Sequence, residues 1–122
     1  MMLKEISDGM EALGLNYAYL EWNDAPVHPY FVGEYNEFES MSEDGLREST
    51  FILTGFNRGS NSELEKARQK IEKYFNRTAG KVVITDNSAV AIFYANAFPI
   101  RTGDAELKKI QINLTIKEWK VK

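Results

Sequence analysis

The stretch KKIQINLTIK, residues 108–117, carries the clearest strand pattern in the chain. Successive side chains of a strand point to opposite faces, so residues two positions apart share a face. One face is apolar and the other polar: Ile110, Ile112, Leu114 and Ile116 lie on the first, and Gln111, Asn113, Thr115 and Lys117 on the second. We therefore expect a strand with its apolar face in the core. At Trp119 and Val121 the apolar phase shifts by one residue, which indicates either a β-bulge or an exposed edge that packs on another chain.

Upstream segments rich in β-branched and aromatic residues predict more strands. They are LNYAYLEW (15–22), PYFVGEY (29–35, with the strand beginning at Tyr30) and TFILTGF (50–56). The apolar segments KVVITDNS (81–88) and AVAIFYANAF (89–98) are separated by the turn-forming pair Asp86-Asn87, so they could form a hairpin. Ser88 could instead cap a short helix, although the alternation of residues 89–98 favours a strand.

Two segments have the three- and four-residue apolar spacing of an amphipathic helix. The first covers residues 2–13 and is followed by Gly14, a typical C-terminal cap. The second extends from about 62 to 76, where Ser62 and Glu65 have the spacing of a capping box. Its apolar stripe consists of Leu64, Ala67, Ile71, Tyr74 and Phe75.

Together these elements predict a single domain over residues 1–122. We expect an α+β fold in which two helices pack on one face of a mainly antiparallel sheet. The expected order is helix, three strands, helix and then two or three strands, and we take the shorter form, α-β-β-β-α-β-β.

Composition excludes several classes of function. The formal net charge is -3, and nucleic-acid binders need clustered Lys and Arg to neutralise phosphates. Lys66, Arg68, Lys70 and Lys73 are interleaved with acidic residues, a pattern typical of a solvated helix face. The chain has no cysteine, which excludes disulfides and thiolate metal sites. It has no long apolar run and no secretory signal, so we expect a cytoplasmic protein without membrane contact.

The loop in ILTGFNRGSNSELE, residues 52–65, has the outward form of a phosphate-binding loop. It lacks the glycine spacing and the lysine of that motif, and Glu63 and Glu65 would repel a phosphate at the helix N-terminus. We interpret Gly55 as a bulge and Gly59 as a turn. No cofactor is therefore expected.

The remaining candidates for chemistry are weak. His28 is the sole histidine and is expected to be an exposed loop residue, without the nucleophile and oxyanion donors that catalysis requires. Glu37, Glu39, Glu43 and Asp44 offer oxygen ligands for calcium, but the segment that holds them has the composition of a flexible loop. We expect neither a metal site nor an enzyme.

The order of elements and several phrases resemble the tail terminator, or tail-completion, proteins of long-tailed bacteriophages and prophages. The phrases are PYFVGEY, TFILTGF, SELEKARQKIEKYF and DAELKKIQINLTIKEWKV, and the resemblance covers essentially the whole chain. It implies a small α+β subunit of a ring, commonly a hexamer, in the virion tail. It is equally compatible with an infectious phage, a defective prophage and a gene-transfer vehicle.

Such a ring ends polymerisation of the tail tube and offers a docking surface to the head-tail connector, after assembly in the bacterial cytoplasm. The implied partners are further copies of the chain, the tail tube protein and connector proteins, while DNA passes without specific binding. A head-tail stopper is one alternative. The other is a monomeric ligand-binding or enzymatic α+β domain that uses His28 or the Gly55 to Ser60 loop.

The segment from Asn36 to Ser49 is predicted to be a long acidic hairpin loop, because it holds five acidic residues and the turn signal Asp44-Gly45. Apolar residues that a loop cannot bury are candidates for contact with a partner. The expected contact residues are three from the loop, Phe38, Met41 and Leu46, together with Tyr35, Arg47 and Trp119.

Overall fold

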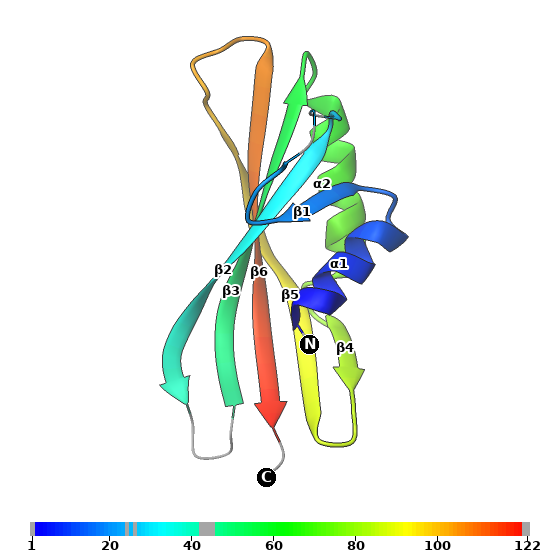
Figure 1. Cartoon of the computed structure of the whole chain (residues 1–122), viewed down its shortest axis with the longest axis vertical. Coiled ribbons are helices and arrows are strands. Elements are labelled where there is room, and N and C mark those ends of the chain that lie inside the picture. The colour runs from blue at the N-terminus through cyan, green and yellow to red at the C-terminus, as the bar shows by residue number, and fades with distance from the viewer. Residues whose placement is uncertain (1, 24, 26, 42–45, 121–122) are drawn as a thin grey trace.

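A computed structural model describes residues 2–23, 25, 27–41 and 46–120, and it describes residues 37–41 and 120 by their backbone alone. The element order is α1 (Met2–Ala12), β1 (Asn16–Tyr19), β2 (Tyr30–Met41), β3 (Leu46–Arg58), α2 (Ser62–Tyr74), β4 (Lys81–Ile84), β5 (Ser88–Ile100) and β6 (Leu107–Lys120). Figure 1 shows the long strands running along the molecule with a strong twist, and both helices on one side of them.

The predicted fold class needs correction. The chain is broadly α+β, but half of it is strand, and the sheet is mixed and curled into a half-barrel. Three strands follow α2, so the expected order with two strands there is wrong. The additional strand arises because residues 85–87 turn the chain between β4 and β5, where the Thr85 N–H donates to the Ser88 carbonyl over 2.8 Å. Residues 81–98 therefore form a hairpin.

The six strands lie in the order β1-β2-β3-β6-β5-β4. β1 runs parallel to β2, and every other neighbouring pair is antiparallel. β6 lies between β3 and β5, so Trp119 belongs to a central strand and the predicted exposed edge is wrong. The bulge lies instead in β5, where the pairing with β6 shifts between Tyr94 and Asn96.

The segment predicted to be an acidic loop is mostly strand. β2 continues to Met41 and β3 begins at Leu46, with Asn36 paired to Thr50 and Glu37 to Ser49. β1 pairs only with Tyr30 to Gly33 of β2, so beyond Gly33 no described strand pairs with the far edge of β2. Charged side chains are common on edge strands, because the hydrogen bonds between strands are made by the backbone and do not depend on apolar side chains.

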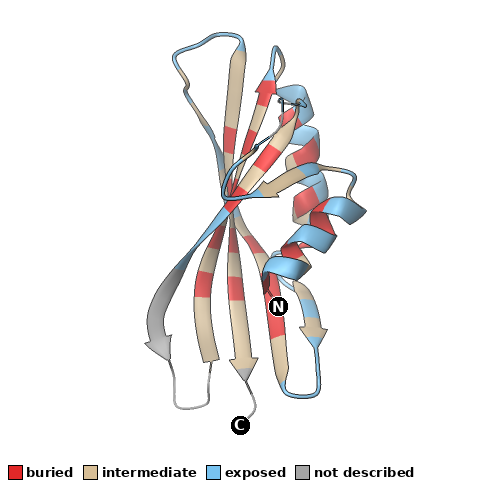
Figure 2. Ribbon diagram, in the orientation of Figure 1, coloured by how far each residue is buried: buried red, intermediate tan, exposed pale blue. Residues whose placement is uncertain are grey.

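The core lies between the helices and one face of the sheet. Figure 2 shows buried residues on both helices and on the long strands. The largest fully buried side chains include Ile6 and Met10 of α1, Leu64 and Ile71 of α2, and Phe31, Phe51, Ile112 and Leu114 of the sheet. We call the opposite face of the sheet the open face.

Gly55 is not a bulge as predicted, because it pairs in regular register with Phe31 and Ile110. A Cβ atom at this position would lie 2.5 Å from a ring carbon of Phe31. Gly33 makes room for the Phe51 ring in the same way, at 2.6 Å. Both glycines therefore allow a phenylalanine ring to lie across the neighbouring strand.

Among the described residues, no helix is long and apolar enough to cross a membrane.

Candidate assembly surface

Four of the six predicted contact residues come together at one end of the sheet. Leu46 is the register partner of Trp119, and Arg47 is the register partner of both Met41 and Glu118. The strands β2, β3 and β6 therefore place these residues side by side. We call this region, defined by Met41, Leu46, Arg47 and Trp119, the hairpin end.

The other two predicted residues lie apart from the hairpin end or are only partly described. Tyr35 pairs with Phe51, is 41% exposed, and its ring centroid lies 6.5 Å from that of Tyr19. Phe38 is described by its backbone alone, and residues 42–45 lie outside the described residues. Glu43 and Asp44, which were considered as calcium ligands, also lie outside them.

A row of apolar residues crosses the open face at the hairpin end. Ile84 pairs with Ala89, Ala89 with Trp119, and Trp119 with Leu46. Directly paired residues of neighbouring strands point to the same face. Ile84 is 76% exposed, and its neighbour on that face, Val82, is 50% exposed. We call Ile84, Ala89, Trp119 and Leu46 the apolar row.

Ile84 and Ala89 were not predicted as contact residues. Both residues were placed in apolar segments, but Val82, Val83 and Ile84 are consecutive apolar residues, so their sequence does not indicate which of them face the core. The pairing of β5 with β6, which aligns them with Trp119, joins distant parts of the chain and leaves no local signal. Nothing in the sequence alone identified the row.

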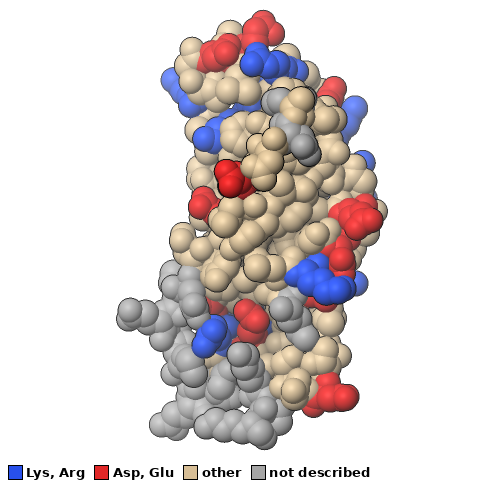
Figure 3. Space-filling view, viewed as in Figure 1, with Lys and Arg blue, Asp and Glu red and all other residues tan. Residues whose placement is uncertain are grey.

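The middle of the open face is uncharged and mostly polar on its two central strands. β3 and β6 contribute three paired positions there: Thr50 with Thr115, Ile52 with Asn113, and Thr54 with Gln111. The amide side chains bond to one another, with Asn113 Nδ2 donating to Asn96 Oδ1 over 2.7 Å and Gln111 Nε2 donating to Asn113 Oδ1 over 3.0 Å. Figure 3, a single view of the surface, shows a broad uncharged area across the middle of the molecule.

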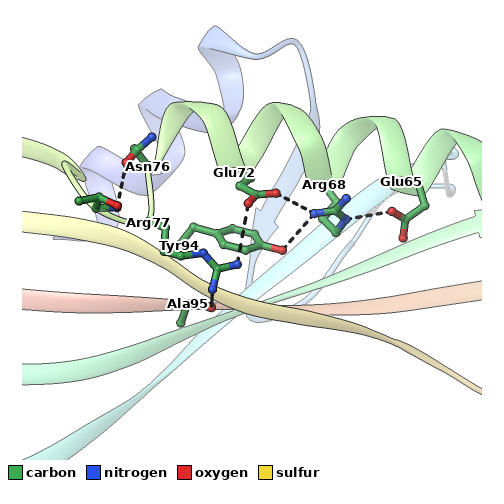
Figure 4. Close-up of polar contacts among 8 residues, drawn as sticks. Glu65, Arg68, Glu72, Asn76, Arg77, Tyr94 and Ala95 are labelled. Atoms are coloured by element: carbon green, nitrogen blue, oxygen red, sulfur yellow. Dashed lines mark hydrogen bonds and ion pairs between the residues drawn. The ribbon is translucent and has the colours of Figure 1, made fainter.

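A network of charged side chains joins α2 to the bulge in β5 (Figure 4). The Arg68 guanidinium donates to Glu65 and Glu72, each over 2.9 Å, and to the Tyr94 hydroxyl over 3.3 Å. The bonds to Tyr94 and Glu65 raise the pKa of Arg68 above its ordinary value. Arg77 donates to the carbonyl of Ala95, the bulge residue, over 3.1 Å.

This network corrects the prediction that Arg68 lies on a solvated face among its acidic neighbours. Arg68 is partly buried and bonds to Tyr94 of β5, whereas Glu65, Lys66, Lys70 and Lys73 are exposed. Since these contacts lie within α2 or join α2 and the residue Arg77 that follows it to β5 and to each other, we assign the network a structural role.

The loop before α2 is a turn, as predicted for Gly59, whose φ is 89°. The Gly59 N–H donates to the Glu106 carbonyl over 2.8 Å. The predicted capping box is wrong, because the residue before the helix is Asn61 and no side chain makes its cap bond. The Ser60 hydroxyl instead accepts a bond from the Ser62 N–H over 3.0 Å. The Ser62 N–H therefore already has a hydrogen-bond partner within the protein.

His28 is half-buried and packs on Tyr30, with 5.4 Å between ring centroids, so the exposed position predicted for it is wrong. Within the part of the chain that the structure describes, no three His, Cys, Asp or Glu side chains are grouped closely enough to hold a metal ion.

Comparison with known proteins gives a likeness of fold. No family model and no curated protein matches the sequence. Among solved structures, a chain of the virion of a native gene transfer agent (GTA) particle is similar, with a TM-score of 0.68 and 10% sequence identity. The match covers 91% of this chain and 84% of that chain. At this identity the likeness establishes the fold alone.

Proposed function

We propose that the protein is a structural subunit of a phage-like particle, and that it forms the ring that ends the tail tube and joins the tail to the head connector. The observation that carries the proposal is the likeness over nearly the full length of both chains to a component of a GTA virion. The sequence independently resembles the tail terminator family, so two different kinds of comparison favour the same setting.

The surface of the subunit suits assembly. A closed ring requires two different surfaces of one subunit to meet head to tail. The apolar row and Val82 provide one such surface, because adjacent apolar side chains exposed on a monomer mark interaction sites. Tyr19 and Tyr35, which are 37% and 41% exposed and stack on each other, provide a second near the β1 edge. Leu46, Arg47 and Trp119 are then close to subunit contacts.

The same arrangement fits a passage for DNA without specific binding. The net charge is -3, and the middle of the open face carries threonine, isoleucine and amide side chains. Of the two lysines that flank it on β6, Lys117 is the register partner of Glu48 and Lys109 lies over the Phe56 ring, so they do not form the clustered cationic surface that grips DNA. The partners in this proposal are further copies of the chain, the tail tube protein and the head-tail connector. No catalytic step and no cofactor is part of it.

A deletion of the gene in its native particle-producing host tests the proposal. Electron microscopy should show overlong tail tubes or tails that fail to join heads, and expression of the intact chain should restore joined particles of normal tail length. A stopper would give a different result, with tails of normal length beside unjoined heads. Joined particles with normal tails from the deletion strain would rule out both roles.

A further inference from the structure

The end of the open face remote from the hairpin end carries a stack of aromatic rings. Tyr30 and Phe56 are register partners, and their ring centroids lie 5.0 Å apart at an interplanar angle of 21°. Trp22 also packs on Tyr30, with 5.0 Å between ring centroids and an interplanar angle of 38°. We call Trp22, Tyr30 and Phe56 the aromatic stack.

The backbone before Trp22 is bent so as to deliver this side chain to the stack. Leu20 has φ of 69°, a left-handed conformation that a bulky residue rarely adopts, and its side chain is 60% exposed. Its N–H donates to the Gly33 carbonyl over 2.8 Å, which fixes the turn. The Trp22 indole N–H then donates to the Ala25 carbonyl over 3.3 Å. Backbone strain of this kind concentrates at functional sites.

The stack borders an open pocket of about 400 Å³ that also contains charged side chains. Glu21 and Glu34 line it, both exposed, and neither forms an ion pair with the lysines and arginines that the structure describes. The one cation among the lining residues, Lys109, has its Nζ 5.5 Å from the centre of the Phe56 ring. The pocket therefore combines aromatic faces with an excess of negative charge.

We infer that this pocket receives an arginine side chain from a partner protein. A guanidinium is planar, stacks on aromatic faces and forms paired hydrogen bonds with carboxylates, so one group satisfies both features of the pocket. Because Lys109 Nζ already lies over the Phe56 ring and Tyr30 packs against both Phe56 and Trp22, the guanidinium stacks on the half-buried Trp22 indole. Tryptophan, tyrosine and arginine dominate the binding energy of protein interfaces, which favours a protein partner.

Intrinsic fluorescence gives a direct test, because the chain has two tryptophans and Trp119→Phe leaves Trp22 as the sole reporter. This variant is titrated with N-acetyl-arginine amide and with N-acetyl-citrulline amide, which has the same shape without the charge. We expect a saturable change with the arginine compound and at least tenfold weaker binding of the citrulline compound. A change without saturation, or equal binding of both, would overturn the inference.

Variants of the two carboxylates locate the binding. Glu21→Gln and Glu34→Gln should each weaken the arginine titration severalfold, whereas Glu63→Gln, at an exposed position of α2 outside the pocket, should leave it unchanged. Circular dichroism checks that each variant is folded. Equal affinity in all three variants would mean that the carboxylates of the pocket do not bind the guanidinium. The assay needs neither a ring nor a tail, so its result is independent of the proposed function.

Discussion

Gly33 and Gly55 show how single residues shape this sheet. Each is a position in a buried strand where a Cβ atom would lie within 2.6 Å of a phenylalanine ring carbon. The rings of Phe31 and Phe51 cross the places where those side chains would stand. The glycines were visible in the sequence, but their partners were not, which is why Gly55 was interpreted as a bulge.

Gly55→Val should destabilise the protein by about 1–3 kcal/mol, because the added methyl groups must displace the buried Phe31 ring. Chemical denaturation measures the change in the free energy of unfolding. Gly103→Asn is the matched control: Gly103 has φ of 80° and open space around its Cβ position, and asparagine tolerates that conformation. Equal stability of Gly55→Val and the wild type would show that the Phe31 ring moves aside at no cost.

Tyr17 makes stability depend on pH in the alkaline range. Burial, with a smaller contribution from Tyr19, raises the pKa of Tyr17 from 10.0 to about 12. The folded state therefore holds the phenolic proton more tightly than the unfolded state, so this contribution is complete below pH 10 and is lost as the pH rises toward 12. Urea midpoints between pH 9 and 12 should fall more steeply for the wild type than for Tyr17→Phe. Parallel curves would show that Tyr17 titrates normally.

At the scale of elements, β6 and α2 decide how the domain holds together. β6 pairs along its length with β3 on one side and β5 on the other. α2 is joined to β5 by the bond of Arg68 to Tyr94, and Arg77, just after α2, bonds to the bulge residue Ala95. The strand was predictable because its alternation is local. The orientation of Arg68 was not, because helical spacing alone cannot tell which charged side chains face a neighbouring strand.

Two neighbouring positions of β6 test its two faces. Ile112 is fully buried, so Ile112→Asp should prevent folding, since an unpaired buried charge costs several kcal/mol. Asn113→Asp places the same side chain on the open face and should leave the protein folded. Far-UV circular dichroism distinguishes these outcomes. A folded Ile112→Asp variant would contradict the assignment of the core face.

Arg68→Gln should destabilise the domain by about 1 kcal/mol, because it removes partly buried ion pairs together with the bond to Tyr94. Lys66→Gln, an exposed change on the same helix, provides the control and should have almost no effect. Thermal and urea unfolding measure both. A double-mutant cycle with Tyr94→Phe isolates the contact between helix and sheet, and a coupling energy of zero would contradict the structural role assigned to it.

At the scale of the whole molecule, the open face has three parts: the apolar row at the hairpin end, an uncharged polar middle and the aromatic stack at the far end. The helices cover only the other face, so the open face is available to partners. Its two ends differ in chemistry, which suits contacts with two different surfaces.

Ile84→Lys should abolish self-association while leaving the fold intact, because Ile84 is 76% exposed and makes little contribution to the core. Sedimentation of the chain, alone and with the tail tube protein, measures the assembled mass. Ile84→Val retains an apolar side chain and should assemble as the wild type does. Rings of undiminished mass from Ile84→Lys would exclude the apolar row from the subunit contact.

By itself, the sequence determined most of the helices and strands and the residues buried within them, because the periods of strands and helices are local properties. Ile112 and Ile71 were placed in the core for this reason, and Leu46, Arg47 and Trp119 were named as contact candidates. The acidic segment after Asn36 was misjudged because charge was taken to indicate a loop, whereas backbone pairing at an open edge permits charged side chains.

Only the tertiary structure decided which strands lie side by side. The order β1-β2-β3-β6-β5-β4 brings Ile84, Trp119 and Leu46 into one row and pairs Tyr30 with Phe56, and the turn before Trp22 packs that residue on Tyr30. Pairing between distant strands follows from the packing free energy of the entire core, to which every element contributes. The sequence of a single segment does not contain this information, so the apolar row and the aromatic stack could be identified only from the complete fold.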